Sequence, residues 1–243
     1  MKNQLTLIIL FLHLNIYAQE YFQQETNYII NVELNDIEHT LNGKIYIDYK
    51  NNSPQKLDFI WFHLWPNAYK NKNTALAKQI LENGNSDLFY ANEEEKGWMD
   101  GLHFKVNGEI VRWVYHPDHI DICKIILNKP INPGETIRIS TPFFVKIPDA
   151  KFSRLGHVEQ SYMITQWYPK PAVYDKNGWH EMPYLDQGEF YSEFGSFDVS
   201  ITLPENYIVG ATGDLQNKEE VKRLNEIAKV TDTITKFKND LSF

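Results

Sequence analysis

The sequence is short of cysteine, of basic residues and of long apolar runs. Its 243 residues include one cysteine, Cys123, which excludes an intramolecular disulfide and a zinc site built on several thiolates. Lysine and arginine number 24 against 32 aspartate and glutamate residues, and phosphate binding draws on clustered basic side chains, so no nucleic acid partner is expected. No apolar stretch reaches the ~20 residues of a membrane-spanning helix, so no transmembrane segment is expected.

The N-terminus has the layout of a secretory signal peptide. Lys2 supplies a positive charge, residues 5–12 form a short apolar run, and the small residue Ala18 precedes Gln19. The apolar run is too short for a membrane anchor. We therefore expect a signal peptide at residues 1–18, cleaved near Ala18, and a secreted or periplasmic protein.

Aromatic residues are abundant, at 14% of the chain, and favour a sheet-rich structure with large buried side chains. Alternation is clear where Ile45, Ile47 and Tyr49 share one face of a strand. Two turns, Asn107-Gly108 and the Asn132-Pro133-Gly134 run, separate further apolar segments. Together these patterns predict strands over residues 28–34, 41–49, 57–65, 102–106, 110–115, 120–127, 136–147, 162–166, 194–203 and 207–211.

Two helices interrupt the strands. Residues 74–81 follow a possible cap at Asn73, and residues 217–229 place apolar side chains on one face behind a cap at Asn217. Residues 83–100 are predicted to be an acidic surface loop, and residues 168–191 a long aromatic loop that is either functional or a cover for a sheet. The predicted fold class is therefore all-β, one domain with short helical insertions and a C-terminal helix.

Sequence motifs for catalysis are few. The run HEMPY at residues 180–184 resembles the zinc-binding H-E-x-x-H pattern, but Tyr184 replaces the second histidine and Pro183 disrupts the required helix. The run HPDH at residues 116–119 sits between two strands, where a surface turn is favoured over a metal site. Cys123 lies in an apolar alternation and is expected to pack rather than react. No catalytic residue and no metal ligand is predicted.

The aromatic side chains allow two interpretations, a surface that binds a ligand or a packed core. Seven of them could stack on a sugar or a peptide, or could instead fill the core and seal a sheet edge, which is the interpretation that we favour. They are Trp61, Trp65, Trp167, Trp179, Tyr168, Tyr174 and Tyr184.

Several longer runs are distinctive. They are WFHLWPNAY at 61–69, SRLGH at 153–157, TQWYPKPAVYD at 165–175, GWH at 178–180, EFGSFDV at 193–199 and GATG at 210–213. Together they resemble the N-terminal domain of the aminopeptidase N family of zinc metallopeptidases (gluzincins), in the form secreted by Bacteroidetes-type bacteria. The resemblance covers roughly residues 25–216 and is most specific over 165–213.

The resemblance implies a saddle-like or sandwich-like β domain of mixed sheets over residues 19–216, with residues 217–243 as a helical tail. In the family this domain packs on a catalytic domain with a G-x-M-E-N loop and an H-E-x-x-H zinc site, and neither motif occurs here. The resemblance therefore implies a chain that holds no cofactor itself, while full-length relatives hold zinc. It also implies a truncated product whose partners are the missing catalytic domain or a peptide substrate.

One family position for substrate binding falls inside the chain. The family's N-terminal domain points a glutamine toward the first residue of the substrate, and Gln166 matches it. Two positions later many relatives carry an acidic residue or glutamine that holds the substrate α-amine, where this sequence has Tyr168. Gln166 and Tyr168 are the predicted substrate-binding residues.

The expected function is thus that of a non-catalytic domain of a secreted peptidase that removes N-terminal residues from peptides. Two alternatives remain open from the sequence. One is a freestanding β module that binds peptides or glycans through the loop from Gln166 to Tyr191. The other is a subunit that docks on a separately encoded catalytic chain.

Overall fold

The computed structural model describes residues 21–232, so the expected signal peptide at 1–18 lies outside the described residues. The chain divides into two compact units, with the boundary after Pro204. The second unit contains α3 (Lys218–Asp232), and the Oδ1 atom of Asn217 accepts hydrogen bonds from Glu219 N and Glu220 N, which confirms the predicted cap. Within residues 21–232, no helix is both long enough and apolar enough to cross a membrane.

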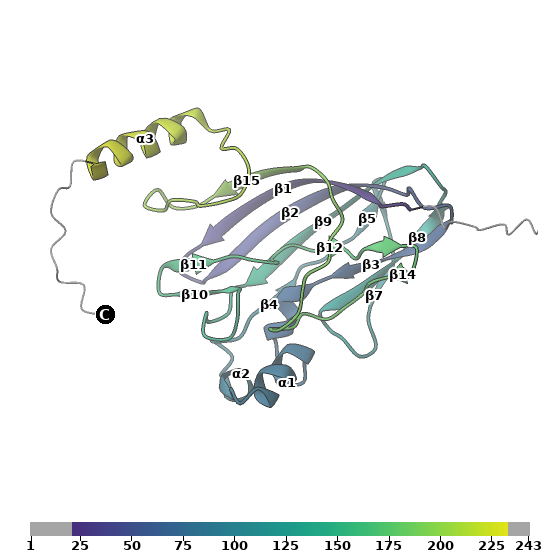
Figure 1. Ribbon diagram of the computed structural model, residues 1–243, viewed down its shortest axis with the longest axis horizontal. Coiled ribbons are helices and arrows are strands. Elements are labelled where there is room, and N and C mark those ends of the chain that lie inside the picture. Colours follow the sequence, from purple (N-terminus) through teal and green to yellow (C-terminus); the bar gives the residue numbers. More distant parts are fainter. Residues whose placement is uncertain (1–20, 233–243) are drawn as a thin grey trace, which may run out of the picture. The chain divides into compact units, whose positions relative to one another are not determined.

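The larger sheet of the first unit has seven strands in the order β15-β1-β2-β9-β5-β6, with β4 also paired to β9 (Figure 1). The pairing of β1 with β15 is parallel and the other pairings are antiparallel, so the sheet is mixed as expected. The strands are β1 (Glu25–Asn35), β2 (Thr40–Lys50), β4 (Trp98–Asp100), β5 (Lys105–Val106), β6 (Glu109–Ile110), β9 (Thr136–Lys146) and β15 (Phe197–Thr202).

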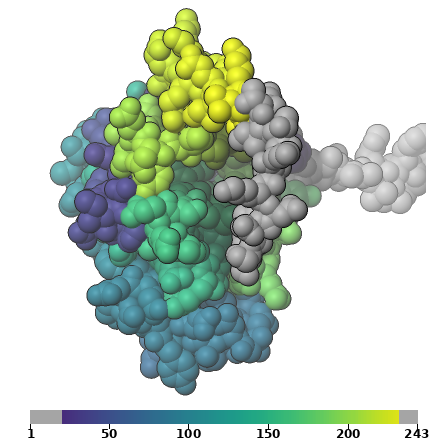
Figure 2. All heavy atoms as spheres, turned by 90° about the vertical axis from the view of Figure 1, so that its left-hand side faces the viewer, coloured from purple at the N-terminus to yellow at the C-terminus, as the bar shows by residue number. Residues whose placement is uncertain are grey.

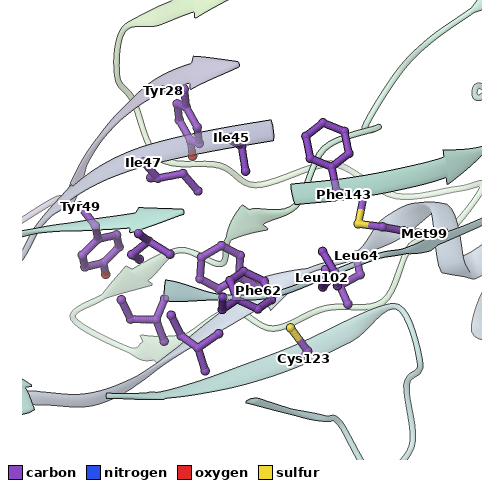
Figure 3. Close-up of a cluster of buried hydrophobic side chains, with 14 of the residues drawn as sticks. Tyr28, Ile45, Ile47, Tyr49, Phe62, Leu64, Met99, Leu102, Cys123 and Phe143 are labelled. Atoms are coloured by element: carbon purple, nitrogen blue, oxygen red, sulfur yellow. The ribbon is translucent and has the colours of Figure 1, made fainter. Parts of the chain in front are cut away.

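A four-stranded antiparallel sheet faces it, in the order β12-β3-β8-β7. Its strands are β3 (Leu57–His63), β7 (Trp113–Tyr115), β8 (Ile122–Ile131) and β12 (Lys170–Pro171). Figure 3 shows side chains of the larger sheet, among them Tyr28, Ile47 and Tyr49, pointing toward Phe62 and Cys123 of the smaller one. The alternation predicted for β2 is confirmed, because Ile45, Ile47 and Tyr49 are all buried. The unit is the sandwich-like all-β domain that the sequence predicts.

A second apolar cluster lies at one end of the unit. It joins the 3-10 helix η1 (Trp65–Tyr69) and the helices α1 (Ala75–Glu82) and α2 (Asp87–Tyr90) to Phe152 and Leu155. In Figure 2 the blue residues of this helical region lie directly against the green residues that follow β9. Two short hairpins complete the unit, β10 (Gly156–Val158) with β11 (Ser161–Met163) and β13 (Tyr174–Asp175) with β14 (Gly178–Trp179).

Several local predictions differ from the structure. The strand predicted over 110–115 is divided between β6 and β7, which lie in different sheets, and the loop predicted at 168–191 contains β12, β13 and β14. The strand predicted over 57–65 ends at His63, because η1 begins at Trp65 with Pro66 in its first turn, and no strand forms at 207–211. The cap of α1 is Thr74 rather than Asn73, since Thr74 Oγ1 accepts a hydrogen bond from Ala77 N. The acidic loop at 83–100 contains α2 and β4. The hairpin at Asn107-Gly108 is confirmed, with φ of 50° and 87°, both in the left-handed region.

Candidate functional site

The segment that carries Gln166 links the hairpin β10–β11 to β12. Lys170 of β12 lies opposite His63 of β3 in the sheet register, which anchors the end of this segment. Gln166 has a φ of 52°, a left-handed conformation that few residues other than glycine adopt. Just before it, Thr165 Oγ1 donates a hydrogen bond of 2.8 Å to Arg154 O. Such a conformation persists only where the surroundings enforce it, and His39, Asn107 and Glu159 adopt it as well.

Lys170 is the buried charge of this site, with 4% of its surface exposed. Its Nζ atom donates hydrogen bonds of 2.7 Å to Gln166 Oε1 and to Ser192 Oγ. The same atom lies 4.1 Å from the ring centroid of Trp65. Among residues 21–232 it forms no ion pair with a carboxylate. Burial therefore lowers the pKa of Lys170 to about 7.

Trp65 and His63 form the apolar side of the site. Their rings stack with centroids 4.3 Å apart, and Trp65 Nε1 donates a hydrogen bond to Met182 O. Burial, with a further contribution from the charge of Lys170, lowers the pKa of His63 to about 3. The imidazole is therefore neutral at physiological pH, so Lys170 is the titrating group of this cluster.

Tyr168 is held by aromatic neighbours. Its ring lies 5.7 Å from that of Tyr28 in an edge-to-face arrangement, and it also packs near Trp167 and Phe197. Burial raises its pKa to about 12, so its hydroxyl stays protonated. Of the two predicted substrate-binding residues, Gln166 is thus held by a buried charge and Tyr168 by the packing of β1 and β15.

A small pocket lies further along the chain, between residues 21–23, the residues that follow β12, and residues 191–193. It has a volume of about 50 Å³ and is lined by Tyr21, Phe22, Gln23, Val173, Asp175, Lys176, Tyr191 and Glu193. Burial raises the pKa of Glu193 to about 7, although the carboxylate accepts a hydrogen bond from Tyr174 N. A space of this size admits water rather than a peptide side chain.

The histidine motifs are placed as the sequence predicts. Residues 180–184 form no helix, and His180 Nε2 lies 2.9 Å from Asp175 Oδ1. The rings of His116 and His119 stack in the turn between β7 and β8. In the described part of the chain, no group of three or more His, Cys, Asp or Glu residues could hold a metal ion. The described residues, 21–232, therefore do not fit a zinc centre.

The remaining candidates pack in or against the core. Cys123 is fully buried, and burial raises the pKa of its thiol far above the ordinary value. Trp65 and Tyr184 are buried, and Trp167, Tyr168, Tyr174 and Trp179 pack against the core while partly exposed. Trp61 is half-buried, and Lys124 Nζ lies 4.9 Å from its ring centroid. The aromatic loop is mainly a cover for the sheets, which favours the packing interpretation over a stacking surface.

The sequence did not single out Lys170 or Ser192 as site residues, and it named Trp65 only as one of seven aromatic residues that could stack on a ligand. A lysine between Pro169 and Pro171 is typical of an exposed turn, and only the pairing of β12 with β3 buries it. One signal was available: His63 stands in the apolar run 57–65, where a polar side chain indicates a buried contact.

No family model matches the sequence, and no curated protein matches it. Among solved structures, the chain is similar to an M1 zinc metallopeptidase E323A mutant from Deinococcus radiodurans bound to a Tyr-Ser-Ala substrate. That match has 15% identity and a TM-score of 0.43, and it covers 82% of this chain and 36% of the other. Another M1 zinc metallopeptidase structure from the same organism has 18% identity and a TM-score of 0.31, with coverage of 52% and 20%.

Yeast LTA4 hydrolase in complex with bestatin has 10% identity and a TM-score of 0.29, and the match covers 51% of this chain and 14% of that one. The chain thus spans at most about a third of the solved structures it matches here. All three TM-scores lie below 0.5, and all three identities lie below 25%.

Proposed function

We propose that this chain forms the non-catalytic N-terminal β domain of a secreted, aminopeptidase N-like zinc metallopeptidase, and that Gln166 contacts the peptide substrate. The run TQWYPKPAVYD at 165–175 and the other distinctive runs support the family. The mixed-sheet β sandwich fits such a domain. The zinc site would come from a further domain, because the sequence contains neither G-x-M-E-N nor H-E-x-x-H.

One observation supports the proposed contact between Gln166 and the peptide substrate. Gln166 combines a left-handed backbone with a side-chain oxygen fixed by the buried Lys170. Gln166 is half-buried, and its Nε2 group has no hydrogen-bond partner among residues 21–232. A strained, oriented and partly exposed amide is the arrangement expected of a ligand contact rather than of a packing residue.

The chain alone should be inactive. Purified protein of 243 residues should hold no stoichiometric zinc and should not cleave aminoacyl anilides, since three zinc ligands and a general base are required for that chemistry. Metal analysis by mass spectrometry and an anilide assay with added zinc measure this. Zinc-dependent turnover would contradict the proposal.

Peptide binding should depend on Gln166. We expect the tripeptide Ala-Ala-Ala to bind weakly and to shift NMR signals of residues 165–170. Gln166→Ala should weaken binding about fivefold, the effect of roughly 1 kcal/mol for one hydrogen bond. Gln216→Ala is the matched control, because Gln216 is an exposed glutamine of the second unit. Equal affinity for the wild type and both variants would remove Gln166 from the peptide site.

A further inference from the structure

The carboxamide of Gln166 has only one way to face Lys170. A lysine ammonium group donates hydrogen bonds and accepts none, whereas a glutamine amide has one oxygen that accepts and one NH2 group that donates. A contact of 2.7 Å between Nζ and the amide therefore requires the oxygen. The usual ambiguity between oxygen and nitrogen in a glutamine side chain does not arise while Lys170 carries its charge, which it does below its pKa of about 7.

Three interactions hold Lys170 in place behind the amide of Gln166. The face of Trp65 lies 4.1 Å from Nζ, Ser192 Oγ takes a second hydrogen bond, and the pairing of β12 with β3 fixes the backbone. With the oxygen turned inward, Gln166 presents its NH2 group outward.

From this geometry we infer that Lys170 determines the specificity of the site: Gln166 binds a hydrogen-bond acceptor of the peptide, a carbonyl or carboxylate oxygen, and not its α-amine. This inference rests on the proposed contact between Gln166 and peptide. An α-ammonium group needs an acceptor, and the amide has one acceptor atom, its oxygen, which already takes a charge-assisted hydrogen bond from Lys170. An α-ammonium group on the second lone pair of that oxygen would lie beside the ammonium group of Lys170. The buried positive charge behind the amide also repels a second cation. Lys170 is a positioning residue, since it acts through Gln166.

The orientation itself can be measured without any ligand. His63 on β3 stays neutral above pH 4, whereas Glu193, which follows Ser192, titrates near pH 7 as Lys170 does. Because Nζ faces the amide oxygen directly, the Gln166 Cδ resonance should report the titration of Lys170 with a midpoint near pH 7, and Lys170→Met separates it from any effect of Glu193. The full chain, labelled with 13C-glutamine, should show this titration, and Lys170→Met should abolish it. Ser192→Ala should lower the midpoint, because it removes an acceptor of the charged form. This variant keeps the test valid if Lys170→Met fails to fold. A Gln166 Cδ signal that is flat with pH in the wild type would overturn the inference.

The ligand chemistry is tested at pH 6, where Lys170 is charged, with three probe peptides. N-acetyl-Ala-Ala-Ala amide offers carbonyl oxygens, N-acetyl-Ala-Ala-Ala adds a carboxylate, and Ala-Ala-Ala amide adds an α-amine. We expect all three peptides to shift the Gln166 Nε2 proton signals. If the acceptor is a carboxylate, the peptide with a free carboxylate should give the largest shift. If the acceptor is a carbonyl, the three shifts should be equal. A shift that requires the free amine would overturn the inference while leaving the proposed function intact. No shift with any peptide would overturn the peptide contact, and this inference with it.

Discussion

Replacing Lys170 by methionine should stabilise the protein at pH 8 by about 2–3 kcal/mol. Each unit of pKa shift corresponds to about 1.4 kcal/mol. Lys170 has a pKa of about 7 in the folded chain against 10.5 as its ordinary value. Between these values the unfolded state binds more protons, so the stability contributed by Lys170 is complete above pH 10.5 and is lost as the pH falls through 7. Methionine fills a similar volume and carries no charge.

The pH dependence distinguishes this effect from a general gain in packing. Between pH 8 and pH 10 the advantage of Lys170→Met should be largest at pH 8 and should shrink toward pH 10, as measured by urea unfolding at each pH. His63 remains neutral over this range, and Glu193, with its pKa of about 7, is ionised in both states above pH 8. Lys129→Met, at an exposed lysine of β8, should change stability by less than about 0.5 kcal/mol. A less stable Lys170→Met variant would mean that the hydrogen bonds of Lys170 outweigh the penalty of burying its charge.

Strands in which apolar and polar residues alternate could be predicted, because one face of each such strand packs against the core. Ile45, Ile47 and Tyr49 are buried on β2, and the turn at Asn107-Gly108 takes the left-handed conformations that its residues favour. The region 207–211 is equally apolar but forms no strand, because β propensity becomes a strand only where a neighbouring strand supplies hydrogen bonds. The local sequence pattern therefore identified the strands, but it did not identify which strands pair with one another.

The site was less predictable than the fold for the same reason. Gln166 was found through a resemblance in one continuous run, whereas its partner Lys170 comes from β12, and the contacts of Lys170 come from η1 and the segment before β15. The burial of Lys170 depends on Trp65, which is 105 positions earlier in the chain, and on Ser192, which is 22 positions later. No spacing rule links such residues, since only the pairing of strands brings them together.

Replacing Gly195 by alanine should destabilise the first unit by about 3 kcal/mol, the upper end of the usual effect of overpacking. A Cβ atom at this position would lie 1.5 Å from the backbone oxygen of Thr26, and a backbone atom cannot turn aside as a side chain can. The parallel pairing of β1 with β15 starts here, with hydrogen bonds from Thr26 N to Phe194 O and from Tyr28 N to Ser196 O. Both should be lost, which urea unfolding and amide hydrogen exchange of Thr26 and Tyr28 would measure.

The strand pairs far from Gly195 provide the internal reference for this variant. Amides shared by β2 and β9 should keep their relative protection, because their hydrogen bonds do not involve β15. Gly210→Ala is the matched control, since no atom lies within 4 Å of the added Cβ, and it should change stability by less than about 0.5 kcal/mol.

Because Ser192 lies three residues before Gly195, displacement of β15 should also weaken the hydrogen bond between Ser192 and Lys170 and lower the midpoint of the titration seen at Gln166. Unchanged stability in Gly195→Ala would show that β15 does not approach β1 so closely, and Ser192 would then have no fixed place beside Lys170.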